Sequence, residues 1–161
     1  MQVAGKIEEV RQEISELSKT TRTAQDLMQG MVKLLHERVL KYNWVGFYML
    51  EPNANPPMLA LGAFEGAMTP HTRIPLNQGI CGAAASSGQT VVVDDVSKDP
   101  RYLACSLETK SEIVVPVFAY GKVVGELDID SHFPAAFTNE HKEFVQYCAV
   151  LVGKKLETSG Q

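Results

Sequence analysis

The segment at residues 111–131, SEIVVPVFAYGKVVGELDIDS, constrains the fold of this chain more than any other stretch. Its two apolar runs, residues 113–117 and 123–129, flank a glycine, which is typical of two antiparallel strands joined by a tight turn. Acidic side chains interrupt the pattern, since Glu112 begins the first run and the second contains ELDID. Because successive side chains in a strand point to opposite faces, the length of the turn decides where these acids lie.

A three-residue turn, Ala119-Tyr120-Gly121 with Gly121 left-handed, would pair Phe118 with Lys122 and Glu112 with Asp128. A two-residue turn would instead place Glu112 on the face opposite Asp128. The three-residue turn separates the side chains cleanly, so we predict it: one face holds Ile113, Val115, Val117, Val123, Leu127 and Ile129, and the other holds Glu112, Lys122, Glu126, Asp128 and Asp130.

The acidic face is not simply a solvated one, because Val114, Pro116, Phe118 and Val124 share it in this register. Like charges opposite each other destabilise a sheet unless one is protonated or a cation or ammonium group lies between them. On these residues alone, a solvated sheet face and a ligand site both stay open.

The rest of the chain predicts helices around a sheet. Residues 2–19 repeat apolar side chains at steps of four and three, a second amphipathic helix is expected from Thr23 to Leu40, and a third follows Thr138. Strands are expected at 43–50, 57–64, 72–76 and 90–95, with a small-residue helix in GICGAAASSG. We predict one α+β domain, a mostly antiparallel central sheet with the N- and C-terminal helices packed on one face.

Within this plan, residues 1–20 form an amphipathic helix that is a candidate contact for a homodimer, and residues 21–158 form the domain proper. Cys148 falls on the apolar stripe of the last helix, which favours a packing role over a chemical one.

Composition excludes several classes of function. The net charge of -4 and the lack of a basic stripe argue against nucleic acid, and no apolar run reaches the roughly 20 residues that span a bilayer. The N-terminus has no apolar signal region, so a cytoplasmic protein is expected. The three cysteines form no CxxC pair and no finger-like pattern with histidine, so neither a metal nor a cofactor is predicted.

Six motifs then follow one another along residues 43–131: NWVGFY, LGAFEG, RIPLNQGICG, the AC of YLACS, SEIVVPV and ELDIDS. Together they resemble the GAF domain and, within it, the free methionine-(R)-sulfoxide reductases. GICG is broadly GAF-like, whereas NWVGFY, SEIVVP with DIDS, and a cysteine seven residues before Glu112 are more specific to the reductases.

The resemblance implies a role for each matching residue. Cys105 would attack the sulfur of free methionine-(R)-sulfoxide, and Glu112, Asp128 and Asp130 would bind the amino group and help to protonate the departing oxygen. Trp44 and Tyr48 would form an aromatic wall for the S-methyl end, with Leu103 and Ala104 beside the cysteine. A raised carboxyl pKa suits this chemistry, because sulfoxide oxygen leaves only when protonated.

Two positions depart from the family pattern. The usual loop cysteine is replaced by His71, and the residue after Cys105 is Ser106 rather than Asp. Cys81 is then a candidate for resolving the sulfenic acid, with an external thiol or Cys148 as alternatives, and thioredoxin or a similar dithiol is the expected reductant. The competing hypothesis is a non-catalytic GAF sensory module that binds a small ligand in the same pocket.

Overall fold

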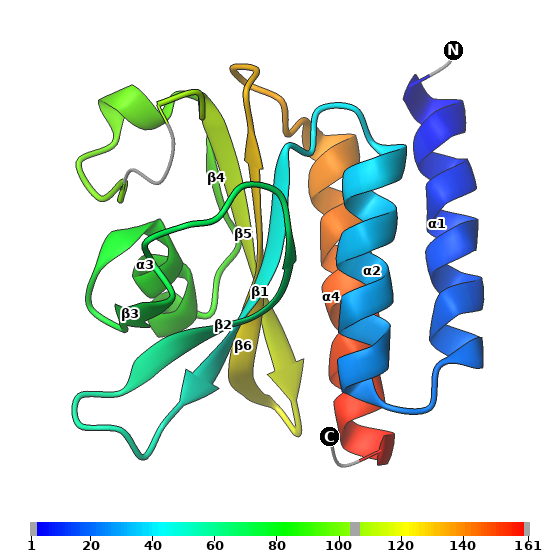
Figure 1. The fold of residues 1–161 in the computed structure, drawn as a ribbon, viewed down its shortest axis with the longest axis horizontal. Helices are drawn as coiled ribbons and strands as arrows, with labels where there is room; N and C mark the ends of the chain where they lie inside the picture. Colours follow the sequence, from blue (N-terminus) through cyan, green and yellow to red (C-terminus); the bar gives the residue numbers. More distant parts are fainter. Residues whose placement is uncertain (1–2, 104–106, 160–161) are drawn as a thin grey trace.

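The computed structural model describes residues 3–103 and 107–159 and shows one sheet between two unequal layers (Figure 1). Three helices, α1 (Val3–Thr20), α2 (Ala24–Arg38) and α4 (Asn139–Ser159), cover one face. The short helix α3 (Gly79–Ser87) and the 3-10 turn η1 (Val96–Lys98) lie on the other side. The predicted α+β class, with terminal helices on one face, is confirmed.

The sheet is antiparallel throughout, with the strand order β3-β2-β1-β6-β5-β4. Its central strands are long and its edge strands short, which limits the unpaired backbone that an edge exposes. The strands are β1 (Trp44–Glu51), β2 (Met58–Glu65), β3 (Arg73–Pro75), β4 (Val91–Val93), β5 (Ser111–Ala119) and β6 (Lys122–Ser131).

The helical layer forms where its capping and apolar signals predict. Thr23 caps α2, because its side-chain oxygen accepts a hydrogen bond of 3.0 Å from the backbone N–H of Asp26. The helix ends at Arg38, two residues before the predicted end at Leu40, and α4 begins directly after Thr138. Cys148 is fully buried in the core between helices and sheet, which confirms its packing role.

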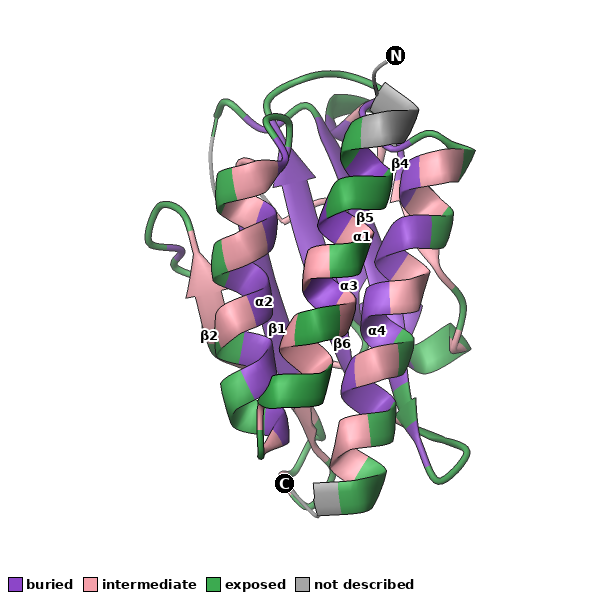
Figure 2. Ribbon diagram, turned by 90° about the vertical axis from the view of Figure 1, so that its right-hand side faces the viewer, coloured by how far each residue is buried: buried purple, intermediate pink, exposed green. Residues whose placement is uncertain are grey.

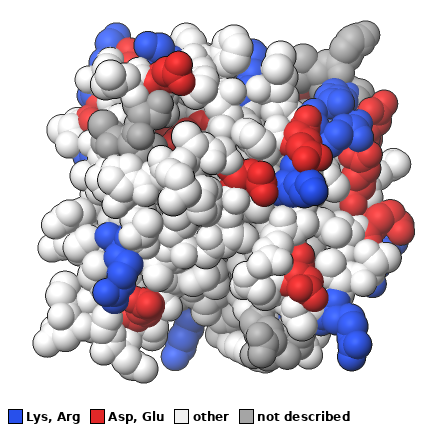
Figure 3. Space-filling view, viewed as in Figure 1, with Lys and Arg blue, Asp and Glu red and all other residues white. Residues whose placement is uncertain are grey.

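The apolar seam of α1 is buried within the chain itself. Ile7, Val10 and Ile14 belong to the same core as α2 and α4, and Figure 2 shows the three helices side by side over the sheet. The outer side of α1 is charged, and Arg38 from α2 joins it by an ion pair with Glu9. Acidic and basic side chains accordingly alternate along that edge of the molecule (Figure 3). A homodimer contact on α1, which stays a prediction, would therefore use polar rather than apolar residues.

The predicted turn of the β5–β6 hairpin is wrong in length. The turn has two residues, Tyr120 and Gly121, with φ angles of 53° and 75°, and Ala119 pairs with Lys122. Positive φ at both central positions gives the twist that suits a two-residue hairpin. Tyr120 tolerates it because both its backbone N–H and its hydroxyl donate hydrogen bonds to Glu157 of α4, at 2.7 and 2.6 Å.

A β-bulge compensates for the shorter turn. Phe118 pairs with Val123 and Val117 pairs with Gly125, so Val124 has no partner of its own. The extra residue restores the predicted faces beyond it but shifts the pairing, and Glu112 lies opposite Asp130 rather than Asp128.

The bulge also reverses the faces of the sheet on which Val123 and Val124 lie. Val124 packs on the helix-side core, and Val123 lies near Gly88 at the end of α3, the reverse of the prediction. The predicted faces are therefore correct from Gly125 onward and wrong at Val123 and Val124.

No helix in the described ranges is long and apolar enough to cross a membrane.

Gly153 on α4 generates a stability prediction. A Cβ at this position would collide with the carbonyl oxygen of Phe118 in β5, which is backbone and cannot rotate away. Glycine to alanine normally stabilises a helix, but here we expect Gly153→Ala to lower the free energy of unfolding by about 1–3 kcal/mol. Urea denaturation measures the change.

Gly30→Ala on α2 is the matched control. Its added Cβ would meet a flexible methyl group of Leu17 at 3.0 Å, so the side chain can yield. A loss for Gly30→Ala equal to that for Gly153→Ala would contradict the backbone explanation.

Candidate functional site

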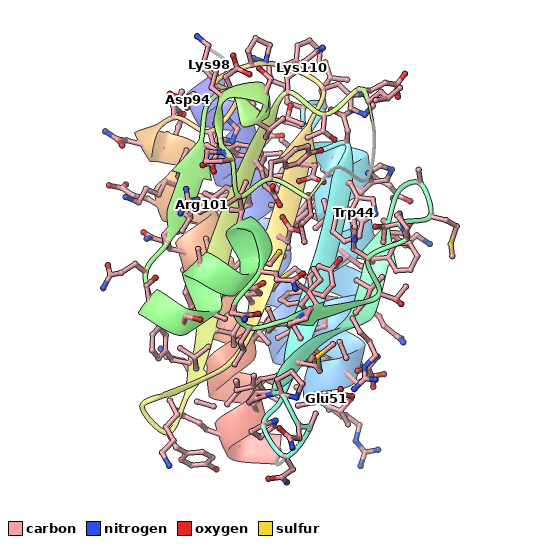
Figure 4. The ribbon with its side chains drawn as sticks, turned by 90° about the vertical axis from the view of Figure 1, so that its left-hand side faces the viewer. Trp44, Glu51, Asp94, Lys98, Arg101 and Lys110 are labelled. Atoms are coloured by element: carbon pink, nitrogen blue, oxygen red, sulfur yellow. The ribbon has the colours of Figure 1, made fainter. Side chains whose placement is uncertain are left out.

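A pocket opens on the face of the sheet opposite the three helices, between the sheet, α3 and the loop that follows η1. Figure 4 looks onto this face, with Trp44 on β1 and Arg101 in the loop. Every described residue of the predicted site lines the pocket: Trp44, Tyr48, Cys81, Leu103, Glu112, Asp128 and Asp130. The remaining two, Ala104 and Cys105, lie outside the described residues.

Strand register brings the acids together. Glu112 on β5 lies directly opposite Asp130 on β6. Asp128, two residues before Asp130 in the same strand, lies on the same face. All three side chains are buried, at 5%, 3% and 5% exposure for Glu112, Asp130 and Asp128. Such a cluster is not a solvated sheet face, so the first of the two sequence interpretations fails.

Burial raises the pKa of two of these carboxyls, and at Glu112 the neighbouring charges add to the shift. Burial, and then the charges of Asp128 and Asp130, raise the pKa of Glu112 well above its usual value. Burial also raises the pKa of Asp128, although hydrogen bonds from Glu112 and Cys81 oppose the shift. Glu112 is thereby placed to hold a proton and donate it to its acidic neighbours, which is the state that a general acid requires.

Cys81 faces the same acids from α3. Its thiol donates to Oδ2 of Asp128 over 3.4 Å, and its side chain is only 5% exposed. Burial, followed by the charges of Asp128, Glu126 and Glu112, raises the pKa of Cys81 well above its usual value. Cys81 is therefore held as a thiol, which is a poor nucleophile compared with a thiolate.

Two glycines allow α3 to approach the sheet and loop this closely. A Cβ at Gly82 would lie 2.6 Å from the carbonyl oxygen of Leu76, and one at Gly79 would lie 2.8 Å from the Leu103 side chain. Gly79 also has a φ of +73°, which other residues rarely adopt. The GICG motif is thus required for the position of Cys81.

The aromatic wall stands beside the acids on the next strand. Trp44 pairs with Asp130, Gly46 with Asp128, and Tyr48 with Glu126, so all these positions share one face. Gly46 is required because any Cβ there would collide with the Trp44 ring.

Hydrogen bonds fix both rings. The indole N–H of Trp44 donates to the carbonyl of Ala67 at 3.0 Å, and the ring stacks on Phe64 with centroids 5.8 Å apart. The Tyr48 hydroxyl donates to the backbone carbonyl of His71 at 2.6 Å. His71 itself lines the pocket, so the residue that replaces the family's loop cysteine lies at the site.

The free volume of the pocket is about 30 Å³, and a neighbouring cavity of about 120 Å³ shares Trp44, Thr69 and Asp130 with it. The smaller volume suits about one or two water molecules. A free amino acid therefore fits only after the lining side chains move apart or the two cavities join.

Sequence reasoning placed Glu126 on the correct face but did not include it in the site. This side chain is fully buried, and neither of its oxygens has a hydrogen-bond partner of normal geometry among the described residues. Burial raises its pKa well above the usual value, while the neighbouring Cys81 thiol opposes the shift and Asp128 adds to it. The strict alternation of Glu126, Asp128 and Asp130 was the signal that could have found it.

The raised pKa of Glu126 should make the stability of the fold depend on pH. Its pKa is raised in the folded chain, so the folded state holds the proton more tightly than the unfolded state, in which the pKa is about 4.5. The stability that this proton provides is complete below pH 4.5 and is lost as the pH rises through the folded-state value. Glu126→Gln cannot ionise, so we expect it to raise the free energy of unfolding at pH 8 by about 1–3 kcal/mol and to flatten the decline above pH 5.

Urea denaturation at several pH values measures both effects. The exposed Glu143→Gln serves as the control, and parallel pH curves for wild type and Glu126→Gln would refute the assignment.

Comparisons with known proteins agree with the site. The chain is 36% identical to the free methionine-R-sulfoxide reductase of Escherichia coli over 126 residues, 78% of this chain and 73% of that protein. It is 41% identical to the enzyme of the same name from Saccharomyces cerevisiae over 113 residues, 70% of this chain and 62% of that protein.

A solved structure gives the same family. The free methionine-R-sulfoxide reductase from Neisseria meningitidis, in complex with its substrate, superposes with a TM-score of 0.92 at 34% identity and covers 100% of this chain and 94% of its own. The family model of the GAF domain matches residues 23–156, which is most of the chain. This chain therefore belongs to the GAF domain family.

Proposed function

We propose that this protein reduces free L-methionine-(R)-sulfoxide to methionine. One observation carries the proposal: the buried acids Glu112, Asp128 and Asp130 and the aromatic rings of Trp44 and Tyr48 line a single pocket. The names of the relatives and of the solved neighbour with its substrate support the same activity.

The acids account for recognition of a free amino acid. An ammonium group placed among Glu112, Asp128 and Asp130 would offset the repulsion between their carboxylates. A methionine sulfoxide residue within a protein has an amide in place of this ammonium group, so it cannot make the same interaction. The faces of Trp44 and Tyr48 suit a polarisable sulfur group, at about 0.3–1.5 kcal/mol for each contact.

The chemical step assigned by the family resemblance uses Cys105. Its thiolate would attack the sulfoxide sulfur, the S–O bond would break, and the oxygen would end on the cysteine as a sulfenic acid. Counted from the thiolate, the exchange takes up one proton at the oxygen, and the transient bond between the two sulfur atoms breaks again, so thiolate, sulfoxide and one proton give sulfenic acid and thioether. Glu112 would supply the proton that the departing oxygen needs, because its pKa is raised.

Regeneration of Cys105 needs a second thiol, and the two internal candidates differ. Cys81 lines the pocket, although its raised pKa makes it a slow nucleophile. Cys148 is fully buried in the helix-side core, where burial raises its pKa to about 12. We therefore propose Cys81 or an external dithiol such as thioredoxin, and we disfavour Cys148.

The second candidate function is a ligand-binding sensor without turnover. The observation in its favour is His71 in place of the family's loop cysteine, at the edge of the same pocket. Such a module would bind methionine or its sulfoxide and leave the oxidation state of both unchanged.

Three further parts of the proposal follow from the sequence. The small, odd number of cysteines in the sequence supports a cytoplasmic location. A homodimer is proposed through the polar outer side of α1. The division into a helix at 1–20 and a domain at 21–158 stays a prediction, since the seam of α1 joins the main core.

The first functional prediction concerns stereochemistry and Cys105. With dithiothreitol as the reductant, we expect methionine to be released from the R epimer of free methionine sulfoxide and not from the S epimer. Cys105→Ser should abolish release, because the hydroxyl cannot replace a thiolate as the nucleophile. Cys148→Ser serves as the control for loss of any cysteine.

Chromatographic analysis of free methionine measures the product. Ligand binding by a folded protein that releases no methionine under excess reductant would instead favour the sensor.

The second functional prediction concerns Glu112. Glu112→Gln keeps the shape of the side chain but cannot donate a carboxyl proton, so we expect kcat to fall by about 10²–10⁴-fold. Single-turnover release of methionine isolates this step from recycling. A fall confined to KM would show that Glu112 only binds the substrate, and the exposed Glu143→Gln should match wild type.

A further inference from the structure

Three donor groups of different chemistry converge at the floor of the pocket. Cys81 comes from α3, Glu112 from β5 and Asp128 from β6, and one ligand atom from each lies within 4.8 Å of the other two. Each of the three side chains is at most 5% exposed. In the described ranges this is the one set of three such groups close enough to hold a metal ion.

A second observation concerns buried oxygen atoms in the same region. Oδ1 of Asp128 and both oxygens of Glu126 are buried and have no hydrogen-bond partner of normal geometry among the described residues. Buried polar atoms are nearly always paired, so these oxygens point to a ligand at this place. Glu126 is outside the trio but interacts with Cys81, one of its members.

We propose that Cys81, Glu112 and Asp128 bind one Zn²⁺ ion when the pocket holds no amino acid. One thiolate and two carboxylates are normal zinc ligands, and a trio leaves the fourth tetrahedral position for water on the side of the pocket. The thiolate selects against Ca²⁺ and Mg²⁺, which prefer oxygen ligands only. Binding releases the thiol proton of Cys81, and any proton held by either carboxyl, to the solvent.

Local spacing in the sequence could not show this set. The three ligands lie 31 and 16 residues apart, and they meet only because α3 packs over the β5–β6 pair. Zinc-binding motifs read from sequence depend on ligands two to five residues apart.

Zinc and substrate would exclude each other, an inference that rests on the proposed function. Glu112 and Asp128 cannot ligate the ion and hold an ammonium group at the same time. Zinc would also mask the Cys81 thiol, so a zinc-bound molecule could neither bind methionine sulfoxide nor use Cys81 in recycling. A thiophilic metal ion would thus inhibit substrate binding and Cys81 reversibly at this site.

Cobalt(II) provides the test, because it occupies zinc sites and a thiolate ligand gives it a charge-transfer band in the near ultraviolet. We expect the full-length reduced protein, titrated without oxygen, to show this band at one Co²⁺ per chain, and Zn²⁺ to displace it. Free L-methionine-(R)-sulfoxide should suppress the band of Cys105→Ala, which turnover cannot oxidise, at rising concentration. The exposed Glu143→Gln variant should bind cobalt as wild type does.

The cysteine variants decide which thiol is the ligand. Cys81→Ala should lose the band, and Cys105→Ala and Cys148→Ala should keep it. A wild type without the band, a band that survives in Cys81→Ala, or a band that disappears in Cys105→Ala would each overturn the assignment.

Competition against a chromophoric chelator gives the zinc affinity without any activity measurement. Even residues that only orient a zinc ligand change the affinity by about 10–100-fold, so Glu112→Gln and Asp128→Asn should each weaken binding at least tenfold. Unchanged affinity in both would refute the site. If zinc binds through Cys81 in a protein that releases no methionine, the metal site stands and the proposed function fails.

Discussion

The pairing of β5 with β6 is the constraint on which the rest of the molecule depends. These two strands are neighbours in the sheet, with β6 also paired to β1, and their register sends apolar side chains to the helices and acids to the opposite face. The same register places Glu112 opposite Asp130 and, through β1, sets Trp44 beside Asp130. Both walls of the pocket therefore follow from one set of backbone hydrogen bonds.

The two layers of the protein have opposite physical characters. On the helix side, an apolar core of α1, α2 and α4 provides the burial that holds the fold. On the other side, a nine-residue helix of small side chains covers four buried acids, which oppose folding when they are charged. The large core thus supports a smaller layer whose composition serves chemistry rather than stability, as expected of a functional site.

Much of this architecture could be predicted from the sequence, because periodicity reports which face of an element is buried. The helices, the strands and the set Trp44, Tyr48, Glu112, Asp128 and Asp130 follow from that alternation and from the family motifs. The turn could not be predicted, because Tyr120 with a positive φ depends on Glu157, a residue distant in the sequence. The alternation with Asp128 and Asp130 places Glu126 on the acidic face, but its interaction with Cys81 could not be predicted, because α3 brings the two together only in the folded chain.

The bulge at Val124 has a consequence for how this hairpin can change in evolution. The two-residue turn and the one unpaired residue of the bulge together keep the acids on the face opposite the helices. If the bulge closed without any deletion, so that Val117 paired with Val124, every later pair would shift by one residue and Glu126, Asp128 and Asp130 would turn toward the apolar core. A three-residue turn at 120–122 without the bulge would preserve the faces and also keep Glu112 opposite Asp130, because Val117 would still pair with Gly125. The hairpin can therefore exchange its bulge for a longer turn, or lose Val124 outright, and still present the same carboxylates at the same spacing.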